Sequence, residues 1–281
     1  MYCSGDFHGG NVVRPYPDKA GQPVIQVGLN NVQSALDWVK QQIGSGYLAR
    51  TFSNLVVMGC SAGSVGTQLW GSEILSQFQW KQAAVVPDSF AGLLPGDSFG
   101  QMLYDYGYCA SGFLSSSLTT KCINKQLTFD DINLEFIGKN PQVPYAFIES
   151  KVDSVQVSFY ISVADMTNNS TPIPMNPTEF YTELNTLFGA YNLNRKNFIT
   201  YLIDGELHCF TDQDRYFTTN TKGITDYGLT TKSPMLYEWV NSLPLNDGQS
   251  IDSQCDSPSS SIPSDNLYCS ANVVPKSFVE S

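Results

Sequence analysis

Residues 54–64 read Asn-Leu-Val-Val-Met-Gly-Cys-Ser-Ala-Gly-Ser and carry the clearest structural signal in this 281-residue chain. The apolar run at 55–58 favours a buried strand. Helical spacing follows at Val65, Leu69, Trp70, Ile74 and Phe78. Between strand and helix, Gly59 and Gly63 flank Ser61 in the Gly-x-Ser-x-Gly pattern that sets a serine on a sharp, strained turn. We predict a nucleophile at Ser61; alternatively the serine only tightens the turn, because short motifs match by chance.

A serine nucleophile needs a base, and the chain contains two histidines, His8 and His208. In hydrolases with this kind of turn the order along the chain is serine, acid, histidine, so His208 is the predicted base. It follows the strand-like run 198–203, and a loop at the carboxyl end of a strand can present such a side chain. The alternative is an ordinary surface histidine.

The acid partner of His208 is predicted to be Asp153. This residue follows 143–149, which reads as a buried strand, and an acid there could accept the imidazole N–H and fix its tautomer. Asp88 is the main rival, and Asp204 lies too close to His208 along the chain. An aspartate in such a position could instead cap a helix or form a turn.

Alternating strands and helices predict an α/β fold with a mainly parallel sheet and catalytic groups at the strand carboxyl ends. Further strands are expected near 1–3, 83–86 and 145–148. Helices are expected over 32–43, from Pro177 with Asn176 and Glu179 at its start, and from Ser233-Pro234. We expect a catalytic domain over 1–245, with a lid or cap insertion at about 94–140, and a Ser/Pro/Asp-rich tail over 246–281.

Several blocks of the chain resemble the pectin acetylesterase and Notum family. Residues 2–10, Tyr-Cys-Ser-Gly-Asp-Phe-His-Gly-Gly, are similar to the family's Tyr-Cys-x-Gly-Asp-x-His-x-Gly signature, and residues 59–63 match its Gly-Cys-Ser-Ala-Gly nucleophile motif. Asp88-Ser89 resembles its Asp-Ser-Gly loop, with Phe90 in place of the glycine. The resemblance extends, with gaps, over roughly residues 1–240 and includes the acid stretch at 147–156 and His208-Cys209.

The resemblance implies an α/β-hydrolase-like three-layer sandwich and a serine carboxylesterase with a triad of Ser61, His208 and Asp153. The N–H of Ala62 is the natural oxyanion donor, because it follows the nucleophile. The acyl group would be acetate on a polysaccharide such as pectin, as in plant and microbial members, or a fatty acyl group on a protein, as in Notum. Polysaccharide deacetylation is our first expectation, since the signature has the pectin acetylesterase form.

Within that signature, Asp6 and His8 are candidate substrate-binding residues. Asp6 could equally cap a turn formed by the neighbouring glycines. One family block is missing: a glycine-rich loop upstream of the signature that supplies further oxyanion donors. Loss of one such donor typically lowers turnover by about 10²- to 10³-fold. We therefore expect an N-terminally truncated chain, and a catalytically impaired binding scaffold is the alternative to an esterase.

Composition narrows the class of partner. The net charge of −11 argues against nucleic acid, because phosphates need clustered Lys and Arg. A neutral sugar polymer suits this negative charge better than a polyanion does. No apolar run reaches the roughly 18 residues of a membrane-spanning helix, so no membrane insertion is expected, and no signal peptide is present in the chain as given. We expect a monomer.

The chain has seven cysteines and the sequons Asn168-Asn-Ser and Asn169-Ser-Thr, which favour a secreted or cell-wall protein. Cys60 is predicted to be a buried free thiol, and Cys109 with Cys122 could close a short loop. Anchors for the tail could be Cys209, Cys255 and Cys269. No C-x-x-C or C-x-x-H pair occurs, so neither a metal nor another cofactor is expected. A cysteine hydrolase using Cys60 is disfavoured, because Ser61 is at the apex of the turn.

Overall fold

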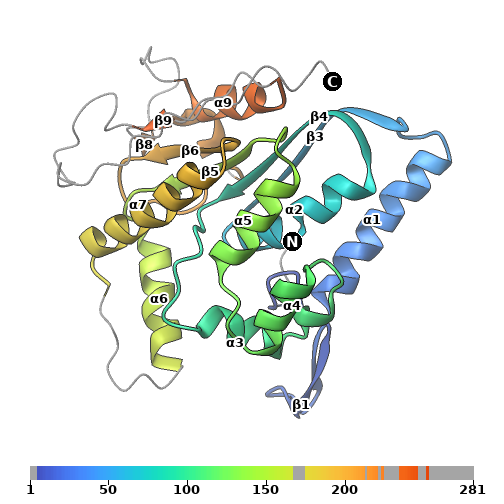
Figure 1. Ribbon diagram of the computed structural model, residues 1–281, viewed down its shortest axis with the longest axis vertical. Coiled ribbons are helices and arrows are strands. Elements are labelled where there is room, and N and C mark those ends of the chain that lie inside the picture. The colour runs from blue at the N-terminus through green and yellow to red at the C-terminus, as the bar shows by residue number, and fades with distance from the viewer. Residues whose placement is uncertain are drawn as a thin grey trace.

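The computed structural model describes residues 5–166, 175–212, 214–220, 223–224, 234–245 and 251–252. The described residues form an α/β fold around a parallel sheet with strand order β3-β4-β5-β6-β9 (Figure 1). These strands are β3 (Thr51–Cys60), β4 (Gln79–Asp88), β5 (Tyr145–Ser150), β6 (Phe198–Ile203) and β9 (Ile251–Asp252). The predicted fold class is confirmed.

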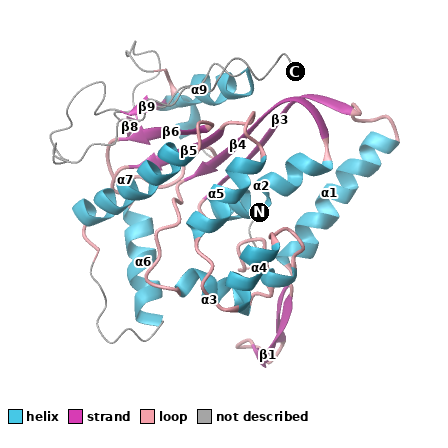
Figure 2. Ribbon diagram, in the orientation of Figure 1, coloured by secondary structure: helices cyan, strands magenta, loops and turns pink. Residues whose placement is uncertain are grey.

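Helices connect and cover these strands (Figure 2). They are α1 (Gly28–Gly44), α2 (Ala62–Gln77), α3 (Ser98–Asp105), α4 (Ser116–Ile123), α5 (Phe129–Lys139), α6 (Ser154–Met166), α7 (Pro177–Asn194), α8 (Arg215–Thr218) and α9 (Leu236–Ser242). Two short antiparallel pairs lie outside the main sheet: β1 (Val12–Pro17) with β2 (Pro23–Gln26), and β7 (Thr219–Asn220) with β8 (Gly223–Ile224). Short 3₁₀ helices are η1 (Tyr108–Ala110) and η2 (Leu243–Leu245).

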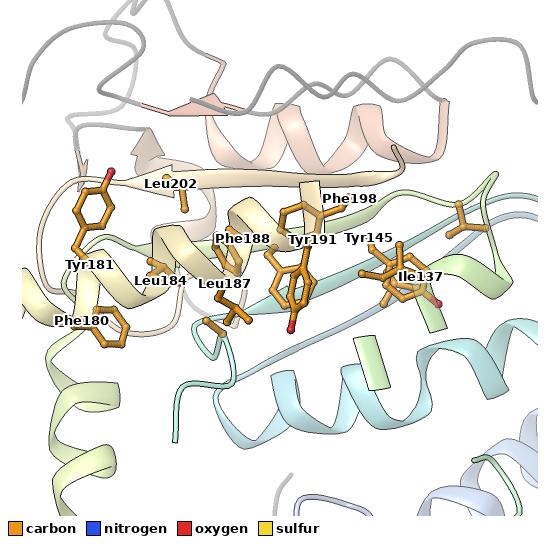
Figure 3. Packing of buried hydrophobic residues seen from close by; sticks show 14 of the residues in the cluster. Ile137, Tyr145, Phe180, Tyr181, Leu184, Leu187, Phe188, Tyr191, Phe198 and Leu202 are labelled. Carbon is orange, nitrogen blue, oxygen red and sulfur yellow. The ribbon is translucent and has the colours of Figure 1, made fainter. Parts of the chain in front are cut away.

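Helices cover both faces of the central strands, so the fold has three layers: helices, sheet and helices. Val85 and Phe147 point into a core shared with α7, whereas their neighbours Val86 and Ile148 point into a core shared with α9. Successive residues of a strand face opposite ways, so a strand between two helical layers must be apolar almost throughout. Figure 3 shows the first core, with Phe188 and Tyr191 of α7 against Phe198 of β6, at ring-centroid distances of 5.4 and 5.3 Å.

Most of the predicted elements are present. The apolar face over 32–43 lies in α1, and the run 198–203 is β6. Helix α7 begins at Pro177, where Asn176 and Glu179 form a reciprocal capping box. The last helix begins at Leu236 rather than at Ser233-Pro234. The helix starts there because Met235 has an extended backbone (φ −63°, ψ 152°) and its N–H donates to the carboxylate of Glu238 at 2.9 Å, which makes Met235 the N-cap.

The predicted tail takes part in the sheet at one point. Ile251 and Asp252 form β9 and pair in parallel with Tyr201 and Leu202 of β6. These two residues of the predicted Ser/Pro/Asp-rich tail therefore extend the main sheet. The strand expected at 1–3, the two sequons and Cys255 and Cys269 lie outside the described residues. None of the helices in the described part of the chain is long and apolar enough to cross a membrane.

Residues 94–140 lie within the connection between the parallel strands β4 and β5, which spans 89–144. Such a connection needs a crossover, and α5 serves as one by packing against α2. Helix α3 and Tyr106 at its end approach the carboxyl edge of the sheet, where Met102 and Tyr106 line a pocket. A lid role for 94–140 stays a prediction. The β1–β2 hairpin and helix α6 are further elements that were not expected from the sequence.

Candidate active site

Ser61 occupies the turn between β3 and α2 with φ 58° and ψ −119°. Non-glycine residues rarely adopt a positive φ, and such strain is characteristic of functional turns. The Ser61 N–H donates to the carbonyl of Asp88 at 2.9 Å, which ties the turn to the end of β4. At Gly59 a Cβ atom would lie 2.6 Å from the carbonyl oxygen of Gly63, so this position requires glycine. The predicted strand–turn–helix is present.

His208 and Asp153 are in direct contact. The Nδ1 atom of His208 lies 2.8 Å from Oδ2 of Asp153, whose side chain is fully buried. The other carboxylate oxygen of Asp153 accepts the backbone N–H groups of Val155 and Gln156, both at 3.0 Å, at the start of α6. An anion at a helix N-terminus is stabilised by these free N–H groups and by the helix dipole. The carboxylate is thus fixed in the orientation that meets the imidazole.

The loop after β5 and the loop after β6 are joined along their length. A buried ion pair of 3.0 Å connects Lys151 with Asp204. Asp204, which the sequence placed too close to His208 to be its acid, thus joins the two loops. The hydrogen bonds between the loops include Lys151 N to Ile203 O (2.9 Å), Val152 N to Gly205 O (3.2 Å), Ser154 N to Glu206 O (3.1 Å) and Ser150 Oγ to Leu207 O (2.5 Å). These contacts between the two loops therefore set the distance between acid and base.

Asp88, the rival acid, holds the segment that follows His208. Its Oδ2 atom accepts hydrogen bonds from the N–H of Phe210 (2.9 Å) and from both N–H and hydroxyl of Thr211 (2.7 Å each). Ser89 donates to Oδ1 at 2.8 Å. Burial raises the pKa of Asp88, although these hydrogen bonds oppose the shift. Because its acceptors point at residues 210–211, Asp88 does not contact the imidazole.

A disulfide joins Cys60 to Cys209, with their Cα atoms 5.5 Å apart. The predictions of a free thiol at Cys60 and of a tail anchor at Cys209 are wrong, because the fold brings the residue before Ser61 beside the residue after His208. The expected bridge between Cys109 and Cys122 is confirmed. Two disulfides fit an oxidising compartment.

The sulfurs of Cys60 and Cys209 also lie within 4.8 Å of a ring nitrogen of His208. This spacing resembles a set of metal ligands. Cysteine binds metals as a thiolate, which a disulfide does not offer. In the oxidised protein these three residues therefore do not form a metal site.

A pocket of about 350 Å³ opens beside Ser61 and His208. Its walls are mostly apolar and come from the N-terminal segment, the start of α2, the loop after β4, the end of α3 and α6: Gly5, Phe7, Ala62, Val65, Phe90, Met102, Tyr106, Val155, Gln156, Phe159, Val163 and Met166. Nε2 of His208 is buried and has no hydrogen-bond partner among the described residues. The pocket thus combines a serine hydroxyl, an available imidazole nitrogen and an apolar wall.

Asp6 and His8 lie elsewhere. Asp6 is fully buried, and its carboxylate accepts the N–H groups of His8 (3.1 Å) and Gly28 (2.7 Å), as expected for the turn-capping alternative. His8 lines a second, shallow pocket of about 210 Å³ with Gly63 and Gly66, on another face of α2. Burial lowers the pKa of His8 and Asp6 opposes the shift. Neither side chain lines the pocket at Ser61.

Sequence reasoning missed the contribution of α6 to the pocket wall. The signal was available, because residues 154–164 contain no charged side chain and are mostly apolar. It also missed the polar pair Glu149 and Gln156, which contact each other behind Asp153.

No protein-family model and no curated protein matches this chain. Among solved structures, it is similar to the Wnt deacylase Notum from Drosophila, with 16% sequence identity and a TM-score of 0.47. The match covers 77% of this chain and 61% of the Notum chain, so this chain spans less than two thirds of that protein's length. At this identity and TM-score the likeness carries no argument, and the functional proposals rest on the site itself.

Proposed function

We propose that this protein is a serine carboxylic ester hydrolase with a triad of Ser61, His208 and Asp153. One observation carries the proposal. His208 contacts a buried carboxylate through Nδ1 at 2.8 Å, while its Nε2 atom is buried without a partner in the described residues, in the wall of a pocket that Ser61 also lines. A base oriented by an acid, beside a serine on a strained turn, is the arrangement that activates a hydroxyl.

In the proposed reaction, Ser61 Oγ attacks the ester carbonyl carbon and its proton passes to Nε2 of His208. The bond between the carbonyl carbon and the alcohol oxygen then breaks, and His208 returns the proton to the leaving alcohol. Water then attacks the carbonyl carbon of the acyl-serine and gives its proton to Nε2 of His208. The bond between that carbon and Ser61 Oγ breaks, and His208 returns the proton to Ser61. Asp153 holds the Nδ1–H and stabilises the imidazolium, and the N–H of Ala62, at the start of α2, stabilises the oxyanion.

The volume of the pocket indicates the length of the acyl group that it can accept. The pocket has a volume of about 350 Å³ and is mostly apolar, so an acetyl group would fill only a small part of it. Pockets of roughly 300 Å³ and more usually bind molecules much larger than acetate. We therefore propose an apolar acyl chain longer than acetate. Among the substrate classes that the sequence resemblance implies, this favours an acylated protein over an O-acetylated polysaccharide, and the two disulfides support an extracellular setting.

The test is a series of p-nitrophenyl esters from acetate to decanoate, with Ser61→Ala as the control. Each buried methylene contributes about 0.8 kcal/mol, so kcat/KM should rise by about fourfold per methylene until the pocket is full. Acetate release from acetylated pectin is measured in parallel. A flat or falling series with efficient pectin deacetylation would overturn the acyl-chain proposal, and turnover that survives in Ser61→Ala would overturn the hydrolase proposal.

A further inference from the structure

The side-chain amide of Gln156 lies between two buried carboxyl groups. Its Nε2 atom donates to Oδ2 of Asp153 at 3.0 Å and to Oε1 of Glu149 at 2.5 Å. Its Oε1 atom accepts the backbone N–H of Ala91 at 3.0 Å. Gln156 is 4% exposed and Glu149 is 1% exposed, so water does not compete for these contacts.

The orientation of this amide is unambiguous. A backbone N–H can only donate, so the atom facing Ala91 must be the amide oxygen. The NH₂ group of Gln156 then points at Asp153 and Glu149, each of which offers an oxygen. With this contact, Asp153 accepts four hydrogen bonds: from Val155 N, Gln156 N, Gln156 Nε2 and His208 Nδ1.

Glu149 has no link of its own to the reaction. It is the next-to-last residue of β5, does not line the pocket at Ser61, and its Oε2 atom has no hydrogen-bond partner among the described residues. The pKa of Glu149 lies well above its usual range because the side chain is buried and because Asp153 and Asp88 are nearby. A protonated Glu149 still offers Oε1 as an acceptor to Gln156.

We infer that Glu149 and Gln156 are positioning residues for the triad acid: Glu149 Oε1 holds the Gln156 amide, and the amide holds Oδ2 of Asp153 against His208. The inference rests on the proposed function. Without the acceptor at residue 149, one N–H of Gln156 is left unsatisfied in the interior, and the amide can regain a partner only by turning away from Asp153 or Ala91. The carboxylate would then lose one of its four donors.

The test compares Glu149→Leu with Glu149→Gln in the 281-residue protein, using p-nitrophenyl butyrate. Substitution at residue 149 is preferable to substitution of Gln156, which also lines the pocket. Leucine removes the acceptor at similar size, whereas glutamine keeps a carbonyl oxygen for the Gln156 amide. Glu149→Met is a second variant that repacks more easily. Asn185→Leu is the control: Asn185 is a buried amide of α7 that donates to Tyr181 O at 3.0 Å, away from the site.

We expect Glu149→Leu and Glu149→Met to lower kcat by about 10- to 100-fold with KM within about twofold, as for a misplaced catalytic group. Glu149→Gln should recover most of that loss, and Asn185→Leu should keep the wild-type kcat. Wild-type kcat in the folded leucine or methionine variant would overturn the inference, as would a loss carried by KM or an equal loss in Glu149→Gln. If the wild-type protein has no Ser61-dependent turnover, the proposed function itself fails, and with it this role.

Discussion

Removing the Cys60–Cys209 disulfide should destabilise the protein more than removing the Cys109–Cys122 disulfide. The bridged residues are 149 positions apart in the first case and 13 in the second. In the chain-entropy relation for cross-links, these separations correspond to about 5 and about 3 kcal/mol of lost stability. A typical domain is stable by about 5–15 kcal/mol, so the first loss takes a third or more of the total.

The assay is urea unfolding of the two double cysteine-to-alanine variants, followed by far-ultraviolet circular dichroism. The free energies of unfolding should differ by about 2 kcal/mol in favour of the variant that keeps the long-range bridge. Because Cys60 precedes Ser61 and Cys209 follows His208, loss of this bridge should also lower kcat, whereas loss of the short one should not. Equal destabilisation, or a greater effect of the short bridge, would refute the reasoning.

Asp88→Asn replaces an acceptor of three hydrogen bonds with an amide, so we expect about tenfold lower kcat and a lower melting temperature; wild-type values in both would contradict the role assigned to Asp88. The pKa of Glu149 is raised by burial, so above pH 4.5 this side chain keeps its proton in the folded state but loses it in the unfolded chain. The free energy of unfolding should therefore fall as pH rises, by up to about 1.4 kcal/mol per pH unit. Thermal melts from about pH 5 to 7 should show a smaller decline for Glu149→Gln, and parallel declines would contradict this. Val163→Phe narrows the apolar pocket and should lower kcat/KM for octanoate about tenfold relative to acetate, as measured by paired ester assays; an unchanged ratio would place the acyl chain elsewhere.

The surroundings of Ser61 could be predicted from the sequence because their causes are local. A buried strand, two glycines and a helical apolar pattern are all contiguous between residues 54 and 78. The capping box at Asn176 and the run 198–203 are local in the same way. For such segments, the residues that determine the conformation are neighbours in the chain.

Asp153 could be predicted as the partner of His208, but the partners of Asp88 and Glu149 could not, because they depend on which loops meet at the edge of the sheet. Asp88 and Asp153 both follow apolar strands, and only the arrangement of β4, β5 and β6 turns one toward residues 210–211 and the other toward His208. The pairing of Cys60 with Cys209 depends on the same arrangement. The sequence defined the candidates, and the tertiary structure selected among them.

The central claim is that His208 activates Ser61, and covalent labelling tests it most directly. The protein is treated with a fluorophosphonate, and the modified residue is identified by mass spectrometry in the wild type and in His208→Ala. We predict modification of Ser61 in the wild type, at a rate that falls by about 10³-fold or more without the imidazole. Absence of labelling, labelling at another residue, or equal labelling of Ser61 in both proteins would contradict the account.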